Sequence, residues 1–373
     1  MSHLTLLLTS CFCAAASAVA QNAEFTLRGH VPGLKPGIEV ALMSNEDNGF
    51  ENLATATVGK GGRFELRGHV EHPVLCTLTT NNLNQISKEV DRGDYKHVHW
   101  TYTPVFVDNV DMQVSCPKYS LWNDAPISDN FRISGGQVQE DFNDYNLMLA
   151  QCGLADMWTA DPERLDSARL SFIESHPTSV VSVKLAAEKL VGGYNLKADE
   201  IKHLQETLTG CPADTARYAS FQRSAELALL TANGNPLVDL DLVTPSGERC
   251  QLSDVARGRE GLLLIDFWAS WCGICRASTP EIVELYNQYP RQQFDVISVS
   301  SDEKSDAWQQ AMDKDRMPWA QYCLTKQGFR DFFEKYQITG VPYYLLVNSD
   351  GRVIGSPARV SSIKEVIEAM KNK

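Results

Sequence analysis

The chain has 373 residues, of which 43% are apolar, and its formal net charge is −13. One typical domain takes roughly 100–200 residues, so the length predicts a multidomain protein, and the apolar content is sufficient to build real cores. The acidity and the lack of a basic run argue against nucleic-acid binding, for which a basic patch is the usual footprint.

A leader is predicted over residues 1–20. The run Leu4–Ala16 is uncharged and largely apolar, and the small-x-small pattern Ala18-Val19-Ala20 follows it. These features predict a secretory signal peptide and a periplasmic or other extracytoplasmic location. A second interpretation takes Cys11 as a lipoprotein cysteine that carries a lipid anchor. The apolar run is shorter than the ~20 residues that span a bilayer, so an uncleaved anchor is not expected.

Residues 22–118 consist of short alternating segments separated by Gly, Pro, Asn and Asp, which is typical of a small β-sandwich or barrel. The segment Phe25–Val31 is echoed by Phe64–Val70, so two similar strands are predicted to lie in one sheet. Four histidines in this region are interpreted as ordinary strand residues rather than metal ligands: His30, His69, His97 and His99.

Residues 135–232 change to helical periodicity and are predicted to form a helical connector. Asp161-Pro162 is typical of a helix start, and Gly192-Gly193 is typical of a stop. The predicted helices are Glu140–Gln151, Pro162–Ser175, Val180–Val191, Asp199–Leu208 and Ala216–Thr231. Their apolar stripes are interpreted as core and docking faces, with a partner-binding role as the alternative.

Residues 233–373 are predicted to form an α/β domain. The expected elements are a hairpin of Val238–Val243 and Glu248–Leu252, strands at Leu262–Phe267, Phe294–Ser300 and Tyr343–Val347, and helices at Ala277–Tyr289, Asp306–Lys314 and Ser362–Lys371.

The most informative motif, Trp271-Cys272-Gly273-Ile274-Cys275, stands between the first long strand and its helix. Two thiols three residues apart can form a reversible disulfide. The unpaired backbone N–H groups and the macrodipole at a helix start favour a thiolate on Cys272, and a thiolate is the species that attacks disulfides. Cys275, one turn further in, is expected to be shielded and to resolve the mixed disulfide. Structural zinc is the alternative, but the two further ligands that it needs are not evident, so no metal is expected.

The segment Asp266–Cys275 closely resembles the active-site segment of thioredoxin-fold oxidoreductases. Pro280 matches the proline that kinks the active-site helix of that family, and Gly340-Val341-Pro342 matches its cis-proline loop. Over roughly 140 residues the C-terminal part resembles the TlpA/ResA and redoxin branch. Residues 22–118 resemble the β-rich domain that precedes thioredoxin-like domains in exported proteins of Bacteroidetes.

This resemblance implies roles for three residues outside the cysteine pair. Pro342 is expected to pack against the disulfide, Val341 to offer backbone groups to an extended substrate, and Trp271 to belong to the substrate-binding surface. No organic cofactor is implied. The predicted fold is thus an N-terminal β-sandwich-like domain, a helical connector and a C-terminal α/β thioredoxin fold.

Asp266 is a carboxylate inside an apolar strand, where the resemblance places a buried acid. Burial disfavours the charged form and raises the pKa of such a group. We expect Asp266 to exchange a proton with Cys275, which is general acid-base work. The alternative is an Asp at a strand end that reaches solvent, as most Asp residues do.

Two departures limit what the resemblance implies. Ile274 stands where many members of the family carry proline, and residues between the cysteines tune the potential, so the redox direction stays open. Ser278 stands where TlpA/ResA-type reductants often carry glutamate, which weakens a role in cytochrome c maturation.

The remaining cysteines are interpreted as buried small apolar residues. They are Cys76, Cys116, Cys152, Cys211, Cys250 and Cys323. A Cys152–Cys211 disulfide and a redox role of Cys323 are the alternatives.

The function predicted from the sequence is an exported thiol-disulfide oxidoreductase that exchanges disulfides with protein substrates, more as a reductant than as an oxidant. By resemblance, a membrane thiol carrier donates the electrons. One alternative is a thiol peroxidase, with Arg276 and Thr279 near the cysteine. The other is a surface binding or assembly protein whose redox pair is vestigial.

Overall fold

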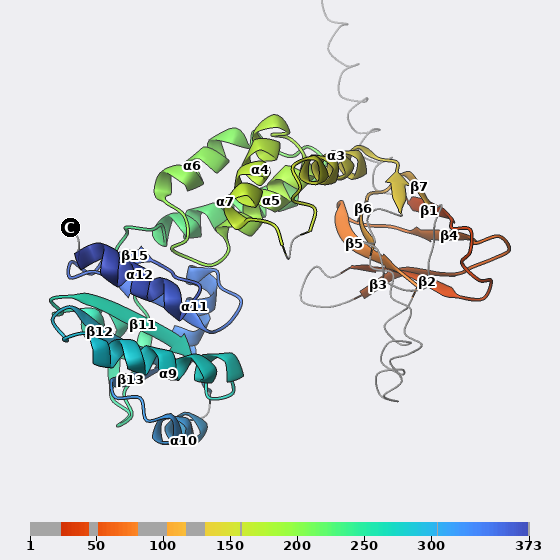
Figure 1. The fold of residues 1–373 in the computed structure, drawn as a ribbon. Helices are drawn as coiled ribbons and strands as arrows, with labels where there is room; N and C mark the ends of the chain where they lie inside the picture. Colours follow the sequence, from red (N-terminus) through yellow and green to blue (C-terminus); the bar gives the residue numbers. More distant parts are fainter. Residues whose placement is uncertain are drawn as a thin grey trace, which may run out of the picture. The chain divides into compact units, whose positions relative to one another are not determined.

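A computed structural model describes residues 24–44, 51–80, 103–116, 131–156, 159–303 and 305–371 (Figure 1). The predicted leader with Cys11, and the histidines His97 and His99, lie outside these residues. Two compact units divide the chain: Met1–Ser182 with Gly210–Thr215, and Val183–Thr209 with Ala216–Lys373. Within the described ranges, no helix has both the length and the apolar character needed to cross a bilayer.

The first unit contains two four-stranded sheets, with the orders β4-β1-β7-β8 and β3-β2-β5-β6. Their strands are β1 Phe25–His30, β2 Glu39–Ser44, β3 Glu51–Thr57, β4 Arg63–Gly68, β5 Val74–Thr79, β6 Thr103–Val107, β7 Asp111–Ser115 and β8 Arg132–Ser134. Side chains of both sheets, such as Leu27 and Leu42, are buried in one core. Two sheets around one core form a β-sandwich, as the alternating pattern predicts.

The repeated segments are neighbours in the first sheet. Strands β1 and β4 pair antiparallel, with Phe25 opposite Gly68 and Arg28 opposite Glu65. The Arg28 guanidinium lies 3.1 Å from the Glu65 carboxylate, so an ion pair crosses the two strands. The prediction that the echoed segments share a sheet is confirmed.

Helices follow the sandwich. Helix α3 (Gln137–Gln151) is attached to β6, because the backbone N–H of Phe106 donates to the Gln139 side chain over 2.8 Å. Helix α4 (Pro162–Ser175) begins after Asp161, whose carboxylate accepts from the N–H of Arg164. The predicted helix start at Asp161-Pro162 is therefore confirmed.

The second unit begins within α5 (Val180–Leu190) and contains a seven-stranded sheet of order β10-β9-β13-β12-β11-β14-β15. The strands are β9 Asp241–Val243, β10 Arg249–Gln251, β11 Leu262–Trp268, β12 Phe294–Ser300, β13 Ala320–Leu324, β14 Tyr343–Val347 and β15 Val353–Gly355. The helices are α6 Ala198–Thr207, α7 Thr215–Leu230, α8 Leu252–Ala256, α9 Gly273–Gln288, α10 Ser305–Asp315, α11 Lys326–Tyr336 and α12 Val360–Lys371.

Strand β11 lies inside this sheet, parallel to β12 and antiparallel to β14, and every one of its residues is buried. Side chains of a strand alternate between the two faces. Ile265 and Phe267 face a core that includes residues of α8 and α11. Leu262 and Leu264 face a second core that includes residues of α9 and α12. The alternation places Asp266 on the face covered by α9.

The cysteines outside the motif are mostly buried, as the sequence predicts. Cys76, Cys116, Cys211 and Cys323 are buried, Cys250 is partly exposed and Cys152 is exposed. Because Cys152 is a free thiol, the alternative of a Cys152–Cys211 disulfide is not realised in this structure.

Candidate redox site

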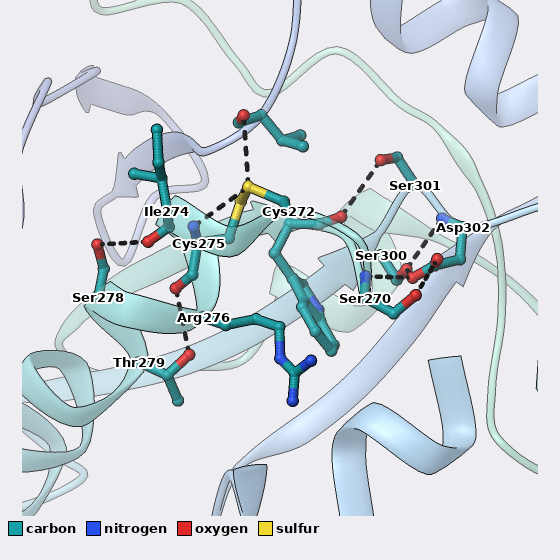
Figure 2. The surroundings of a disulfide bond; sticks show 12 residues. Ser270, Cys272, Ile274, Cys275, Arg276, Ser278, Thr279, Ser300, Ser301 and Asp302 are labelled. Atoms are coloured by element: carbon teal, nitrogen blue, oxygen red, sulfur yellow. Dashed lines mark hydrogen bonds between the residues drawn. A yellow bond between two sulfur atoms is a disulfide. The ribbon is translucent and has the colours of Figure 1, made fainter. Parts of the chain in front are cut away.

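The cysteine pair lies where β11 gives way to α9. Cys272 occupies the N-cap of the helix and Cys275 lies in its first turn, and their sulfurs are joined in a disulfide (Figure 2). The backbone N–H of Cys275 donates to the Sγ of Cys272 over 3.1 Å. This N–H and the positive end of the helix dipole are aimed at the sulfur that is predicted to carry the thiolate.

The disulfide is flanked by exposed apolar side chains. Cys272 and Cys275 retain 7% and 4% exposure, whereas Trp271 and Ile274 are 69% and 73% exposed. Large apolar side chains exposed together at a site are typical of a surface that binds another molecule. Trp271 was expected on the substrate-binding surface, whereas Ile274 was considered only for its effect on the potential.

The predicted cis-proline loop reaches the disulfide. The Val341–Pro342 peptide bond is cis, which confirms that prediction, and β14 begins at the next residue. The carbonyl oxygen of Val341 lies 3.6 Å from the Sγ of Cys272. The loop therefore places backbone groups of Val341 beside the sulfur that a substrate disulfide would meet.

Asp266 is buried, with 4% exposure. Burial raises the pKa of its carboxyl group to about 7, while a hydrogen bond from Ser298 opposes the shift. The Ser298 hydroxyl donates to Asp266 over 2.8 Å and itself accepts from the indole N–H of Trp319 over 2.8 Å. The alternative of an Asp that reaches solvent is therefore wrong. A carboxyl group with this pKa can take up or release a proton at neutral pH.

A second buried carboxylate was not predicted. Asp302 follows β12 and accepts hydrogen bonds from the backbone N–H and the hydroxyl of Ser270, over 2.8 and 2.6 Å, and from Ser300 over 2.6 Å (Figure 2). Ser301 donates its backbone N–H to the carbonyl of Trp268. The end of β12 thus fixes the segment that leads from β11 to Cys272. Polar residues after a strand were the only signal in the sequence.

Helix α10, the predicted insertion, packs at the same site. Trp308 and Ala311 of α10 belong to the apolar cluster that contains Trp268 and both disulfide cysteines. At the end of α10, Asp315 accepts two hydrogen bonds from the Arg276 guanidinium, over 2.7 and 2.6 Å. Such bidentate pairs are geometrically specific, so this pair fixes α10 against the active-site helix.

Three further residues singled out in the sequence have local roles. Thr279 donates its hydroxyl to the carbonyl of Cys275, and Ser278 does the same to Ile274. Pro280 lies inside α9, as the resemblance implies. Cys323 donates to the carbonyl of Asp302, and burial raises the pKa of its thiol to about 11, which favours a structural role.

Comparisons with known proteins also distinguish an N-terminal part from a C-terminal part of the chain. Residues 260–353 match the family model described as thioredoxin-like. Residues 25–142 match a model described as a domain of unknown function (DUF4369). The first match contains the cysteine pair and Pro342, and the second covers the sandwich and the start of α3.

Relatives with names share part of this chain. Probable nucleoredoxin 1 of Arabidopsis thaliana is 30% identical over 115 residues, which are 30% of this chain and 19% of that protein. Nucleoredoxin of Bos taurus is 28% identical over 127 residues, 33% of this chain and 28% of that protein. The chain therefore spans less than a third of the length of either relative. A solved thiol:disulfide interchange protein from Bacteroides sp. is 28% identical, with 38% of this chain and 91% of that chain covered and a TM-score of 0.35.

The buried carboxyl group of Asp266 predicts a pH-dependent stability. Its pKa is about 7 in the folded protein and roughly 3.9 in the unfolded chain. Between these values the folded state binds more protons, so stability falls as pH rises and stays low above pH about 7. We expect Asp266→Asn to remove this fall. At pH about 8 its free energy of unfolding should exceed that of the wild type by up to roughly 4 kcal/mol. Denaturant unfolding of the disulfide form from pH about 4 to pH about 8 measures the difference.

Ser298→Ala provides the matched control for this titration. Removing the Ser298 hydroxyl deletes a hydrogen bond that favours the charged carboxylate, so the fall in stability should move to higher pH. If the stability of the wild type and of Asp266→Asn depended on pH in the same way, the fall in stability could not be assigned to the Asp266 carboxyl group.

Loss of the Asp302 carboxylate should destabilise the site. Asp302→Ala leaves the part-buried donors of Ser270 and the buried hydroxyl of Ser300 without their acceptor, and we expect the free energy of unfolding to fall by roughly 3 kcal/mol. Asp350→Ala, at an exposed turn, serves as the control and should stay within about 0.5 kcal/mol of the wild type. Equal unfolding midpoints for the two variants would count against the network.

Proposed function

We propose that this chain, a multidomain protein whose residues 260–353 belong to the thioredoxin-like family, is an exported thiol-disulfide oxidoreductase that acts on protein disulfides, chiefly as a reductant. One observation carries the proposal. The Cys272–Cys275 disulfide caps helix α9, and the carbonyl of Val341, next to cis-Pro342, lies 3.6 Å from Cys272 Sγ. A reactive dithiol and a backbone surface for an extended chain thus stand side by side.

Cys272 is the attacking residue in this mechanism. In the reduced protein its thiolate attacks one sulfur of a substrate disulfide, and the other substrate sulfur leaves as a thiolate. Cys275 then loses its proton and attacks Cys272 Sγ, so the second substrate sulfur also leaves as a thiolate. Two electrons pass from the protein to the substrate. The product is the Cys272–Cys275 disulfide observed in the structure.

Asp266 handles the proton of Cys275 in this proposal. Its side chain lies on the face of the sheet that α9 covers, and the pKa of its carboxyl group is about 7. The carboxylate can therefore accept the proton when Cys275 attacks, and return it to Cys275 when the disulfide is reduced again. Both steps are general acid-base work by a group matched to neutral pH.

Substrate binding is assigned to the rim of the disulfide. Trp271 and Ile274 supply exposed apolar surface, and Val341 supplies backbone groups beside the sulfur. An extended polypeptide can satisfy both kinds of group at once, because it offers side chains and a backbone edge together. Protein disulfides therefore fit this site better than small molecules.

The remaining parts of the proposal derive from the sequence. The signal-peptide pattern of residues 1–20 supports export, with lipidation at Cys11 as the alternative mode of attachment. A membrane thiol carrier would supply the electrons. The sandwich and the helical connector would then position the dithiol or select the substrates.

Thiol peroxidase activity is supported less well. That activity needs an Arg and a Thr directed at the peroxidatic sulfur, but Arg276 is engaged in two hydrogen bonds with Asp315 and Thr279 donates to a backbone carbonyl. A surface binding protein with a vestigial redox pair is the other alternative. The cysteines, the buried acid and the cis-proline loop are all assembled, which argues for a working redox site.

Insulin reduction by the full chain tests the proposed activity. With dithiothreitol as the source of electrons, the wild type should reduce insulin, and Cys272→Ser should be inactive because the attacking thiolate is gone. Cys275→Ser should stop at a mixed disulfide that mass spectrometry detects. Cys152→Ser, at an exposed free thiol, is the control and should match the wild type. Insulin reduction by Cys272→Ser at the wild-type rate would sink the proposal.

The reduction potential of the pair tests the direction of electron flow. Equilibration in glutathione or dithiothreitol buffers, with Cys272→Ser as the control, should give a value near or below thioredoxin's, about −270 mV. Such a protein must be supplied with electrons. A value of roughly −120 to −180 mV would instead identify a protein that makes or reshuffles disulfides.

A further inference from the structure

The cis-proline loop, residues 337–342, is held at both ends by the helical segment of the same compact unit. At the start of the loop, the N–H of Gly192 donates to the carbonyl of Gln337 over 2.8 Å. The Gln337 side chain donates in turn to the carbonyl of Ser224 on α7 over 3.0 Å. Directly after Pro342, the hydroxyl of Tyr343 donates to the carbonyl of Gly193 over 3.1 Å.

The turn that makes these contacts, Gly192–Tyr194, requires its glycines. Gly192 and Gly193 have φ values of 106° and 45°, and a Cβ on Gly193 would lie 2.6 Å from the carbonyl oxygen of Tyr336. Backbone approach this close is possible only without a side chain. The turn is therefore fitted to the strand and helix that flank the loop.

Tyr194 fixes the turn inside the thioredoxin-like core. Its side chain is buried among the residues that surround β11. The hydroxyl donates to the carbonyl of Pro236 over 2.9 Å and accepts from the N–H of Val238 over 2.7 Å. The turn is thus part of the packed interior, and it is not a flexible link between neighbouring segments.

The geometry points to a function for this turn, and the inference depends on the proposed function. We propose that the Gly192–Tyr194 turn positions the cis-proline loop for substrate binding, with Gln337 and Tyr343 as the positioning residues that connect the two. Only a few residues separate these attachments, and Val341, whose carbonyl faces Cys272 Sγ, lies between them. The helical connector therefore contributes to protein-substrate recognition although none of these contacts involves the disulfide itself.

Reactions with small disulfides and with protein disulfides should respond differently to loss of this support. A small disulfide needs only the sulfur of Cys272, whose N-cap position is set by α9. A protein disulfide also needs the backbone of the loop in the right place. Loosening the loop should therefore weaken recognition of protein substrates and leave the intrinsic reactivity of the dithiol unchanged.

Tyr343→Phe and Gln337→Met test this inference in the full chain. Each removes one hydrogen bond of the turn or of α7 to the loop and keeps the size of the side chain. We expect KM for insulin to rise about five-fold, the effect of one lost hydrogen bond. The kcat for insulin, the reduction potential and the rate with the small disulfide dithiodipyridine should stay as in the wild type.

Tyr218→Phe is the matched control. It removes the hydrogen bond from a hydroxyl that is part-buried, like that of Tyr343, to the carbonyl of Leu208, and neither residue belongs to the turn or to the loop. It should lower the unfolding midpoint about as much as Tyr343→Phe and leave KM for insulin unchanged. A rise in KM for Tyr343→Phe and Gln337→Met but not for Tyr218→Phe supports a positioning role, because general destabilisation would affect all three.

The outcomes separate this inference from the proposed function. An active wild type together with wild-type KM values in both loop variants overturns the positioning role alone. Parallel losses with insulin and with dithiodipyridine also overturn it, because they indicate damage to the dithiol. A wild type that reduces neither substrate overturns the proposed function and, with it, the positioning role.

Discussion

The site depends on the complete burial of strand β11. Both faces of this strand are covered, so every side chain on it must be apolar or must find a partner inside the protein. Asp266 is the one acidic residue on this strand. Burial raises the pKa of its carboxyl group to about 7, so the group stays protonated at pH values where an ordinary Asp is charged. The same strand carries the chain to Cys272, so the acid and the dithiol are placed by one rigid element.

Local pattern predicted the elements that bury a continuous apolar surface. Strand β12 was predicted with the observed bounds, and the cis bond before Pro342 followed from the resemblance. Strand β13 and helix α11 were not predicted, although Phe329, Phe332 and Tyr336 repeat at helical spacing in α11. That aromatic stripe was a usable signal, because it faces the same core as Phe267.

Contacts between distant segments could not be predicted from the sequence. Asp302 and Ser270 are 32 residues apart, and the Tyr343 hydroxyl and Gly193 are 150 apart. A Ser or Asp after a strand is also typical of an ordinary solvated loop. Likewise, Gly192-Gly193 was predicted only as a helix stop, and nothing local indicates that the backbone of this stop supports a loop of another segment.

The shared interior of the helical segment and the thioredoxin-like domain bears on how the chain can be divided. The unit that contains the redox site begins at Val183, within α5, and includes α6, most of α7 and the Gly192–Tyr194 turn. A cut at Asn233, where the pattern of the sequence changes, would remove Tyr194 and uncover the core residues around it. It would also remove the carbonyl groups that accept hydrogen bonds from Gln337 and Tyr343. A fragment that keeps these contacts must therefore begin before Gly192, and the compact unit that holds the redox site extends well beyond the family match over residues 260–353.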